Sequence, residues 1–176
     1  LYMGNVHSEA GRHQLALDAY TKALTVNPQV LSGGDLVSIH NNMGAAYLAM
    51  GNLRLAITSY EKTLSIDPEY EEALSSLEGA RALVNEKSQE RAKELQRRGL
   101  IALVQGRLEM AVSLLRESLG KRALPQTYIA LAQAYERLHD TGAALRVYQT
   151  FLEANPVGPN AEQARLCMAK LRTVED

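Results

Sequence analysis

Residues 51–68 read GNLRLAITSYEKTLSIDP, and residues 11–28 read GRHQLALDAYTKALTVNP. The two stretches carry glycine, alanine, tyrosine and proline at the same offsets. Apolar residues recur in both at intervals of three and four, which is the pattern of an amphipathic helix. Landmarks that repeat at fixed offsets predict that the chain is built from copies of one helical unit.

Two further copies of this pattern follow along the chain. Their landmarks are Gly106, Ala111, Leu115 and Ser118 in the third copy, and Thr141, Gly142, Ala143, Ala144, Tyr148, Phe151 and Pro156 in the fourth. Another amphipathic helix precedes the second, third and fourth copies, around Gly44, Gly99 and Ala132. Strand signals are weak, because no sustained alternation of apolar and polar residues occurs. The sequence therefore predicts four helical hairpins.

This pattern resembles the tetratricopeptide repeat (TPR). The unit of that family has ~34 residues, with small residues where its paired helices touch, aromatic residues between them and a proline at its end. The resemblance implies an all-α superhelix, or α-solenoid, of stacked hairpins. It also implies a protein-interaction scaffold or adaptor, because the first helices of such hairpins line a concave groove that accepts a peptide or helix of another protein.

Physical chemistry gives each landmark a structural role. Glycine is the residue that ends a helix most cheaply in the left-handed conformation. Small alanines permit close helix packing, and tyrosines fill the space toward the neighbouring helix. Proline ends or opens a helix. We assign these roles to Gly11, Gly51 and Gly106, to Ala16, Ala56, Ala111 and Ala144, to Tyr20, Tyr60 and Tyr148, and to Pro28, Pro68 and Pro156.

The spacing of the repeats departs from the family in two places. From Ala16 to Ala56 the chain has about six residues more than the ~34 expected. We assign the excess to a loop at residues 29–35, in which two glycines make a flexible turn and Asp35 caps the next helix. From Ala56 to Ala111 the excess is about twenty-one residues, which is enough for one extra helix.

The extra helix is predicted at about residues 69–87, and its apolar stripe lapses at residues 85–91 before it resumes. The stripe comprises Tyr70, Ala73, Leu74, Leu77, Ala80 and Val84, and after the gap Ala92, Leu95, Leu100 and Val104. Neither glycine nor proline lies between Ala80 and Arg98. We therefore expect one bridging helix of about 35 residues; a break near Ser88 is the alternative.

Residues 160–174 form a further amphipathic pattern, with Ala164, Cys167, Met168 and Leu171 on one side. A solenoid needs a terminal helix that covers its last apolar face, and this segment suits that capping role. Residues 1–88 are then two hairpins with an extra helix, and residues 89–176 are two hairpins with a capping helix. The two parts are also compatible with one continuous solenoid.

Composition excludes several classes of function. The formal net charge is −1, so the basic footprint of a nucleic-acid-binding protein is absent. No run approaches the ~18 apolar residues that a membrane span requires. The chain begins with Leu1 inside a helical pattern, from which we expect it to be a fragment of a longer protein. Its compartment is left open between the cytoplasm, which we favour, and the cell envelope.

The residues that carry chemistry are scattered. His7, His13, His40 and His139 fall on different hairpins without partners at metal-ligand spacing, and Cys167 lies on an apolar stripe. Gly33 and Gly34 mark a turn, because no phosphate-binding loop precedes a helix there. We therefore expect neither catalysis nor a metal or cofactor site.

By the resemblance, the first helices of the hairpins supply a mixed polar groove with a basic side. Asparagine side chains can hold a peptide backbone through a paired donor and acceptor, and Arg97 can hold a carboxylate with two hydrogen bonds. The candidate groove residues are Asn5, Ser8, Asn41, Asn42, Ala45, Ala49, Lys93, Arg97, Gln133 and Arg137.

Three alternatives stay open. Some TPR co-chaperones hold the C-terminal carboxylate of chaperones, and Asn5, Asn42, Lys93 and Arg97 match that clamp, although Leu1 stands where it has a lysine. The chain is alternatively the regulatory or targeting domain of a larger enzyme, such as a methyltransferase or kinase. A third alternative is a self-assembling structural unit. The bridging helix is also a candidate docking or homodimerisation surface, because an exposed Leu95 could pair across a two-fold axis.

Overall fold

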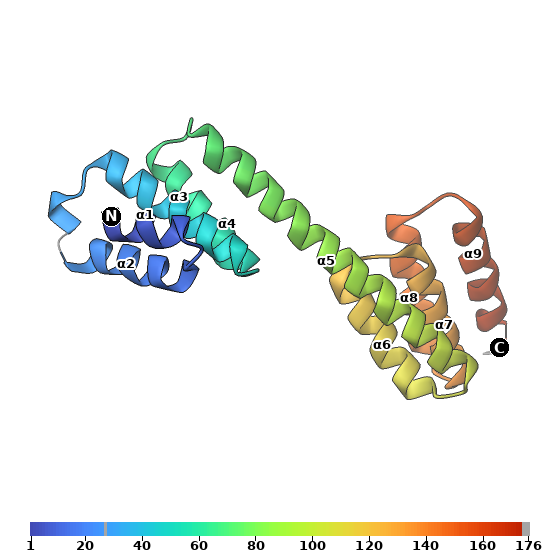
Figure 1. The fold of residues 1–176 in the computed structure, drawn as a ribbon. Coiled ribbons are helices and arrows are strands. Elements are labelled where there is room, and N and C mark those ends of the chain that lie inside the picture. Colours follow the sequence, from blue (N-terminus) through green and yellow to red (C-terminus); the bar gives the residue numbers. More distant parts are fainter. Residues whose placement is uncertain (27, 174–176) are drawn as a thin grey trace. The chain divides into compact units, whose positions relative to one another are not determined.

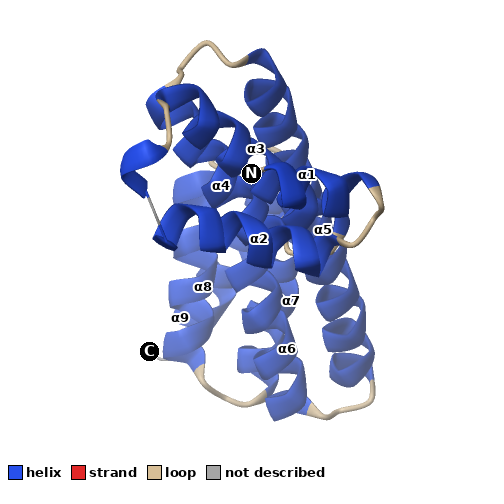
Figure 2. Cartoon of the chain, turned by 60° about the vertical axis from the view of Figure 1, so that its left-hand side comes forward, coloured by secondary structure: helices blue, strands red, loops and turns tan. Residues whose placement is uncertain are grey.

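The computed structural model describes residues 1–26 and 28–173, and its described residues form nine α-helices, one short 3-10 helix and no strand (Figures 1 and 2). The chain divides into two compact units, Leu1–Glu86 and Lys87–Asp176. Each unit holds two helical hairpins followed by one further helical segment. The prediction of an all-α repeat fold is therefore confirmed.

The first unit contains two hairpins and the first part of a long helix. Its elements are α1 (Tyr2–Glu9), α2 (His13–Val26), η1 (Pro28–Val30), α3 (Gly33–Ala49), α4 (Leu53–Ile66) and the beginning of α5 (Glu71–Val104). The helix pairs α1–α2 and α3–α4 are the two hairpins, and α2 also packs on α3.

The predicted turn glycines adopt the predicted conformation. Gly11, Gly51 and Gly106 have φ angles of 69°, 75° and 74°. In the first of these turns the amide of Gly11 donates to the carbonyl of Ser8, and that of Arg12 donates to His7. These bonds satisfy carbonyl groups at the end of α1 that have no partner inside the helix.

The small and aromatic landmarks form the hairpin cores as predicted. The four repeat alanines are fully buried, and so are Tyr20, Tyr60 and Tyr148. Each ring of the first two hairpins lies directly on a glycine: a Cβ added to Gly4 would be 2.3 Å from Tyr20, and one added to Gly44 would be 2.6 Å from Tyr60. The rings therefore use space that only a bare backbone leaves.

One prediction about the first unit is wrong, namely that Gly33 and Gly34 lie in a flexible turn with Asp35 as the cap. Both glycines belong to the first turn of α3, and Ser32 is its N-cap. The Ser32 hydroxyl accepts from the Asp35 amide at 3.1 Å, and the Asp35 carboxylate accepts from the Ser32 amide at 2.9 Å. This reciprocal capping box offsets the weak helix propensity of two glycines.

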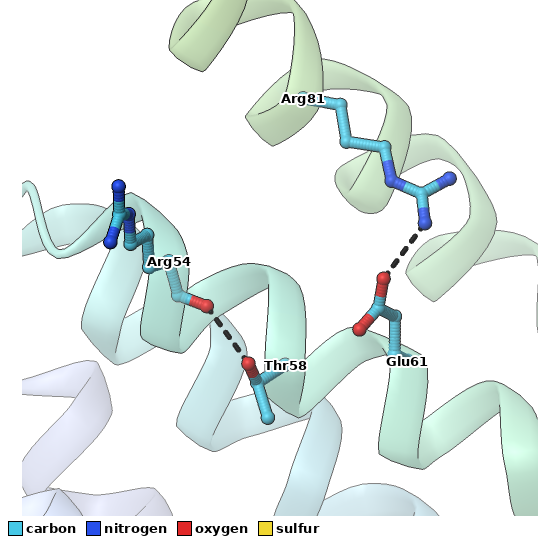
Figure 3. A network of polar contacts seen from close by, with 4 residues as sticks. All are labelled: Arg54, Thr58, Glu61 and Arg81. Carbon is cyan, nitrogen blue, oxygen red and sulfur yellow. Dashed lines mark hydrogen bonds and ion pairs between the residues drawn. The ribbon is translucent and has the colours of Figure 1, made fainter.

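The bridging helix is confirmed, because α5 runs as one helix of 34 residues. Its first part packs on α4, where Ala73 and Leu77 join the cluster of Ala56 and Tyr60. Figure 3 shows the ion pair that ties the two helices, between Arg81 and Glu61 at 2.8 Å. Four members of the predicted stripe are exposed, namely Leu74, Val84, Leu100 and Val104.

The second unit continues from Lys87 with the remainder of α5. Its other helices are α6 (Leu108–Lys121), α7 (Pro125–Arg137), α8 (Thr141–Ala154) and α9 (Pro159–Arg172). The polar part of α5 faces the end of α6: the Ser88 hydroxyl donates to the Lys121 carbonyl at 3.1 Å, and the Ser118 hydroxyl donates to the Ala92 carbonyl at 2.8 Å. The polar residues that interrupt the apolar stripe thus include a hydrogen-bond donor for a carbonyl group at the C-terminal end of α6.

The homodimer hypothesis relied on an exposed Leu95, and this expectation is wrong. Leu95 is 0% exposed, so it is a core residue of the second unit. The apolar pattern of α5 could not show that Leu95 is buried, because the sequence of a helix is the same whether or not another helix packs on a given residue.

The capping role of the last helix is confirmed. Ala161 and Ala164 of α9 are buried against Tyr148 and Phe151, and Cys167, Met168 and Leu171 pack against the same cluster. Val174, the last residue of the predicted helix, lies outside the described residues. Cys167 has the packing role that its apolar stripe predicted.

Candidate functional site

The first unit contains a polar cluster that joins its first three helices. The Asn5 Oδ1 atom of α1 accepts two hydrogen bonds, from the Tyr20 hydroxyl of α2 at 2.8 Å and from the Asn42 Nδ2 group of α3 at 3.2 Å. We call Asn5 and Asn42 the amide pair. The pair exists because the core tyrosine that packs on Gly4 reaches α1 with its hydroxyl.

Electrostatics keeps the hydroxyl of this cluster in its donating form. Burial raises the pKa of Tyr20, and its contacts with Asn42 and Ser8 lower it by less than burial raises it. The phenol therefore stays protonated at neutral pH and holds Asn5 in one orientation. Ser8, a second predicted groove residue, is half-buried beside this hydroxyl.

The amide pair leaves one amide nitrogen and one amide oxygen without a partner. Within the described part of the chain, neither the Nδ2 group of Asn5 nor the Oδ1 atom of Asn42 has a hydrogen-bond partner. A peptide group offers the complement, a carbonyl acceptor and an amide donor. The pair is therefore equipped to bind one stretch of extended backbone.

The remaining predicted residues of the first unit differ in accessibility. Ala45 and Ala49 are exposed, and Ala45 follows Asn42 by one helical turn, so it lies on the same face of α3 as Asn42. Asn41 is 2% exposed, and its Oδ1 atom has no hydrogen-bond partner among the described residues. Asn41 lies beneath the surface that Asn42 reaches.

In the second unit, Lys93 lines a hollow between three helices. The hollow has a volume of about 300 Å³ and is lined by Lys93 and Gln96 of α5, by Leu124, Pro125 and Gln126 at the start of α7, and by Asn160 of α9. The prediction named only Lys93 of this set. Gln96 was detectable, because it follows Lys93 by three residues and lies on the same helix face.

The two predicted arginines of this unit are already engaged. Arg97 donates two hydrogen bonds of 2.9 Å to Glu94, and the pair lowers the pKa of Glu94. Arg137 donates to the backbone carbonyl of Leu103, at the end of α5. Gln133 is half-buried on α7. Glu94 therefore occupies the Nε–Nη2 edge of Arg97, and another carboxylate has to displace Glu94 to bind that edge with two hydrogen bonds.

The described residues contain no cluster of three or more histidine, cysteine or acidic side chains that could hold a metal ion. None of the described helices is both long enough and apolar enough to cross a membrane.

Comparisons with known families identify the repeat. A family model of the tetratricopeptide repeat matches residues 1–69, and a second tetratricopeptide repeat model matches residues 125–157. Together the two matches cover more than half of the chain. No curated protein sequence matches significantly.

Solved structures with a similar fold are distant in sequence. The TPR2AB domain of yeast Sti1, solved in a complex with pHSP90, is 19% identical over 97% of this chain and 68% of that chain, with a TM-score of 0.49. The thermophilic TPR protein TTC0263 of Thermus thermophilus is 21% identical over 98% and 97% of the two chains, with a TM-score of 0.43. A crystal structure of MamA is 22% identical over 86% and 93%, with a TM-score of 0.41.

Proposed function

This chain belongs to the tetratricopeptide repeat family, and from that premise we propose that it is a protein–protein interaction module that binds a segment of a partner on its first unit. The observation that carries the proposal is the amide pair, in which two side chains from successive first helices, α1 and α3, hold each other through one hydrogen bond. We propose no catalytic role.

Preorganisation supports this assignment. A flexible asparagine loses rotamer freedom when it binds a ligand, at a cost of about 0.5–1.5 kcal/mol per side chain. Asn5 and Asn42 have lost that freedom before a ligand arrives, because the Tyr20 hydroxyl and their mutual bond fix them. The unused donor and acceptor are therefore offered in a fixed geometry.

The same pair favours an extended segment over a helical one. A helix uses its backbone amides and carbonyls internally, so it has none to offer along its length. An extended peptide presents both groups at every residue, and backbone hydrogen bonds give such complexes affinity with little demand on the side-chain sequence. We therefore propose that the partner binds as an extended chain.

The test begins with a library of random twelve-residue peptides selected on the full chain. The affinity of the enriched peptides is then measured by fluorescence anisotropy for the parent and for Asn42→Ala. Loss of one net hydrogen bond, about 0.5–1.5 kcal/mol, predicts binding that is weaker by about two- to tenfold. Asn52→Ala is the matched control, because Asn52 is exposed and makes no capping hydrogen bond.

N-methylation of the peptide distinguishes backbone from side-chain recognition. Methylation at the residue whose amide meets Asn42 removes the same hydrogen bond as Asn42→Ala, so the two changes together should cost no more than either one alone. Additive losses at every peptide position, or an unchanged affinity in Asn42→Ala, would refute recognition by the amide pair.

A further inference from the structure

The second unit has a cleft that none of the predicted groove residues lines. Helices α6 and α8 each pack against α7 and not against each other within the described residues, which leaves a gap between them. The gap has a volume of about 370 Å³. Its lining comprises Arg116 and Leu119 of α6, Tyr128, Leu131 and Tyr135 of α7, and Ala143, Arg146, Val147 and Thr150 of α8.

The floor of this cleft is formed by one aliphatic and two aromatic side chains of α7. Tyr128, Leu131 and Tyr135 follow one another at helical spacing along one face of α7, and Leu131 is 3% exposed. The two tyrosines are half-buried. A side chain placed between α6 and α8 would bury apolar surface against these rings, which is favourable in proportion to the area removed from water.

The rims of the cleft carry positive charge without a compensating acid. Arg116 lies on α6 and Arg146 on α8, both are exposed, and neither side chain has an ion-pair or hydrogen-bond partner in the described part of the chain. None of the nine lining residues is acidic. A free arginine alone is ordinary on a protein surface, but here two of them flank one apolar floor from different helices.

Three acidic side chains on or next to these helices accept from groups other than the two arginines, although Asp140 Oδ1 and Arg146 Nη1 both lie within 4 Å of the place of a Cβ added to Gly142. Glu117 pairs with Arg91 at 3.4 Å, Glu136 accepts from the Tyr148 hydroxyl at 2.7 Å, and Asp140 caps α8 by accepting from the Ala143 amide at 2.9 Å. Neither Arg116 nor Arg146 makes an ion pair within the described residues.

We infer that this cleft is a second protein-interaction surface, which binds a short acidic segment of a partner protein. One aliphatic or aromatic side chain of the segment occupies the cleft over Leu131, and carboxylates on either side of it pair with Arg116 and Arg146. A guanidinium group binds a carboxylate with two parallel hydrogen bonds, so one arginine on each of two helices selects a segment with an acidic residue on both sides of its apolar side chain.

This inference goes beyond the proposed function, since it concerns other helices and a different ligand chemistry. The amide pair selects backbone groups and is indifferent to charge, whereas the cleft selects acidic side chains next to an apolar one. Either surface can therefore fail its test while the other passes.

The test selects random twelve-residue peptides on the Asn42→Ala chain, in which the amide pair is disabled. Peptides that also bind the Arg116→Glu/Arg146→Glu chain are discarded. The expected survivors combine aspartate or glutamate with a leucine or an aromatic residue. An empty selection, or survivors without acidic residues, would overturn the inference.

Affinities of the surviving peptides are then compared by fluorescence anisotropy at two salt concentrations. Arg116→Ala and Arg146→Ala should each weaken binding by about tenfold and reduce its salt dependence, and Arg116→Lys should restore part of the loss. Both arginines are exposed and without partners, so these variants keep the fold. Arg54→Ala, which removes an exposed arginine of the first unit, should bind like the parent.

Two competitors test whether the cleft reads more than charge. An oligoglutamate peptide without apolar residues and vesicles with phosphatidylserine should both compete weakly. If either displaces the selected peptides as effectively as an unlabelled copy, the surface attracts anions in general and the inference is wrong.

Discussion

The spacing between the two helices of the second hairpin depends on one missing methyl group, and Gly44→Ala tests this directly. A Cβ at this position would lie 2.6, 2.7 and 2.9 Å from three ring atoms of Tyr60. The ring is 1% exposed and packed among Ala56, Ala73 and Leu77, so it has no free space to move into. Overpacking of this kind costs about 1–3 kcal/mol.

A second glycine supplies the matched control. Gly79 lies inside α5 in the same unit, and a Cβ added there has no atom within 4 Å. In a helix interior alanine is favoured over glycine by about 0.8–1 kcal/mol, so Gly79→Ala should stabilise the first unit by that amount. Gly44→Ala gains the same helix propensity but incurs the overpacking, so we expect a net loss of up to about 2 kcal/mol.

The assay is urea denaturation of the full chain, followed by circular dichroism and by the fluorescence of the buried tyrosines. Both variants lie in the first unit, so both shift the unfolding transition of that unit. The difference between their free energies of unfolding then gives the cost of the clash between the added Cβ and the Tyr60 ring. The fourth hairpin carries Ala132 where the second carries Gly44. A hairpin can therefore accommodate a methyl group at this position when its two helices are spaced for it. If Gly44→Ala stabilises the unit as much as Gly79→Ala does, glycine does not set the helix spacing and the argument is refuted.

Three further predictions concern a turn, a cap and the amide pair. His139 occupies the turn position of the fourth hairpin with a φ of 58°, so His139→Gly should raise the stability of the second unit by roughly 1 kcal/mol, measured as an increase in Tm; an unchanged or lower Tm would contradict this. Hydrogen bonds from the side chain and amide of Ser32 lower the pKa of Asp35 from its ordinary value of 3.8. The ionised carboxylate therefore stabilises the folded state at neutral pH, and this stabilisation is lost as the pH falls below 3.8 and Asp35 becomes protonated. The Tm of Asp35→Asn should accordingly lie below that of the parent at pH 7 and approach it at pH 3, and a constant difference would rule out the linkage. Tyr20→Phe keeps the ring on Gly4 but removes the donor to Asn5, so it should destabilise the first unit by about 1 kcal/mol and weaken peptide binding at the amide pair; wild-type affinity would show that the hydroxyl does not orient Asn5.

The sequence predicted those features that depend on local chemistry. The turn at Gly51 follows from the cost of a left-handed backbone, and the continuity of α5 follows from the absence of breaking residues. Residues that depend on a distant partner were predicted less well. The burial of Leu95 and the hydrogen bond from Ser88 to α6 both require knowledge of which helix lies opposite, and periodicity does not contain it. The sequence pattern assigned Gly33 and Gly34 to a turn, but they lie in the first turn of α3, because the capping box of Ser32 and Asp35 outweighs the low helix propensity of glycine.

The candidate site was predictable in part for the same reason. Asn5 and Asn42 were named from their places in the hairpins, but Tyr20 was assigned only to the core, since a landmark position shows where a ring packs and not what its hydroxyl reaches. The cleft between α6 and α8 was not predicted, because its arginines come from two helices and belong to no landmark.

The framework positions and the surface positions of the repeats obey different constraints, and the amide pair that we propose as a binding site lies at a position where the copies differ. At the position of Gly4 the other hairpins carry Gly44, Gly99 and Ala132, all of them small, because a ring or a leucine packs there. At the position of Asn5, which directly follows Gly4, they carry Ala45, Leu100 and Gln133, which share no chemistry. An amide pair needs a side chain at this position and a second asparagine on the following first helix. The second hairpin supplies Ala45 at this position, and the amide pair of the first unit joins α1 and α3. A repeat protein of this kind acquires its specificity where its copies differ, and Ala45→Asn is therefore a more informative change for ligand choice than any substitution at the shared core positions.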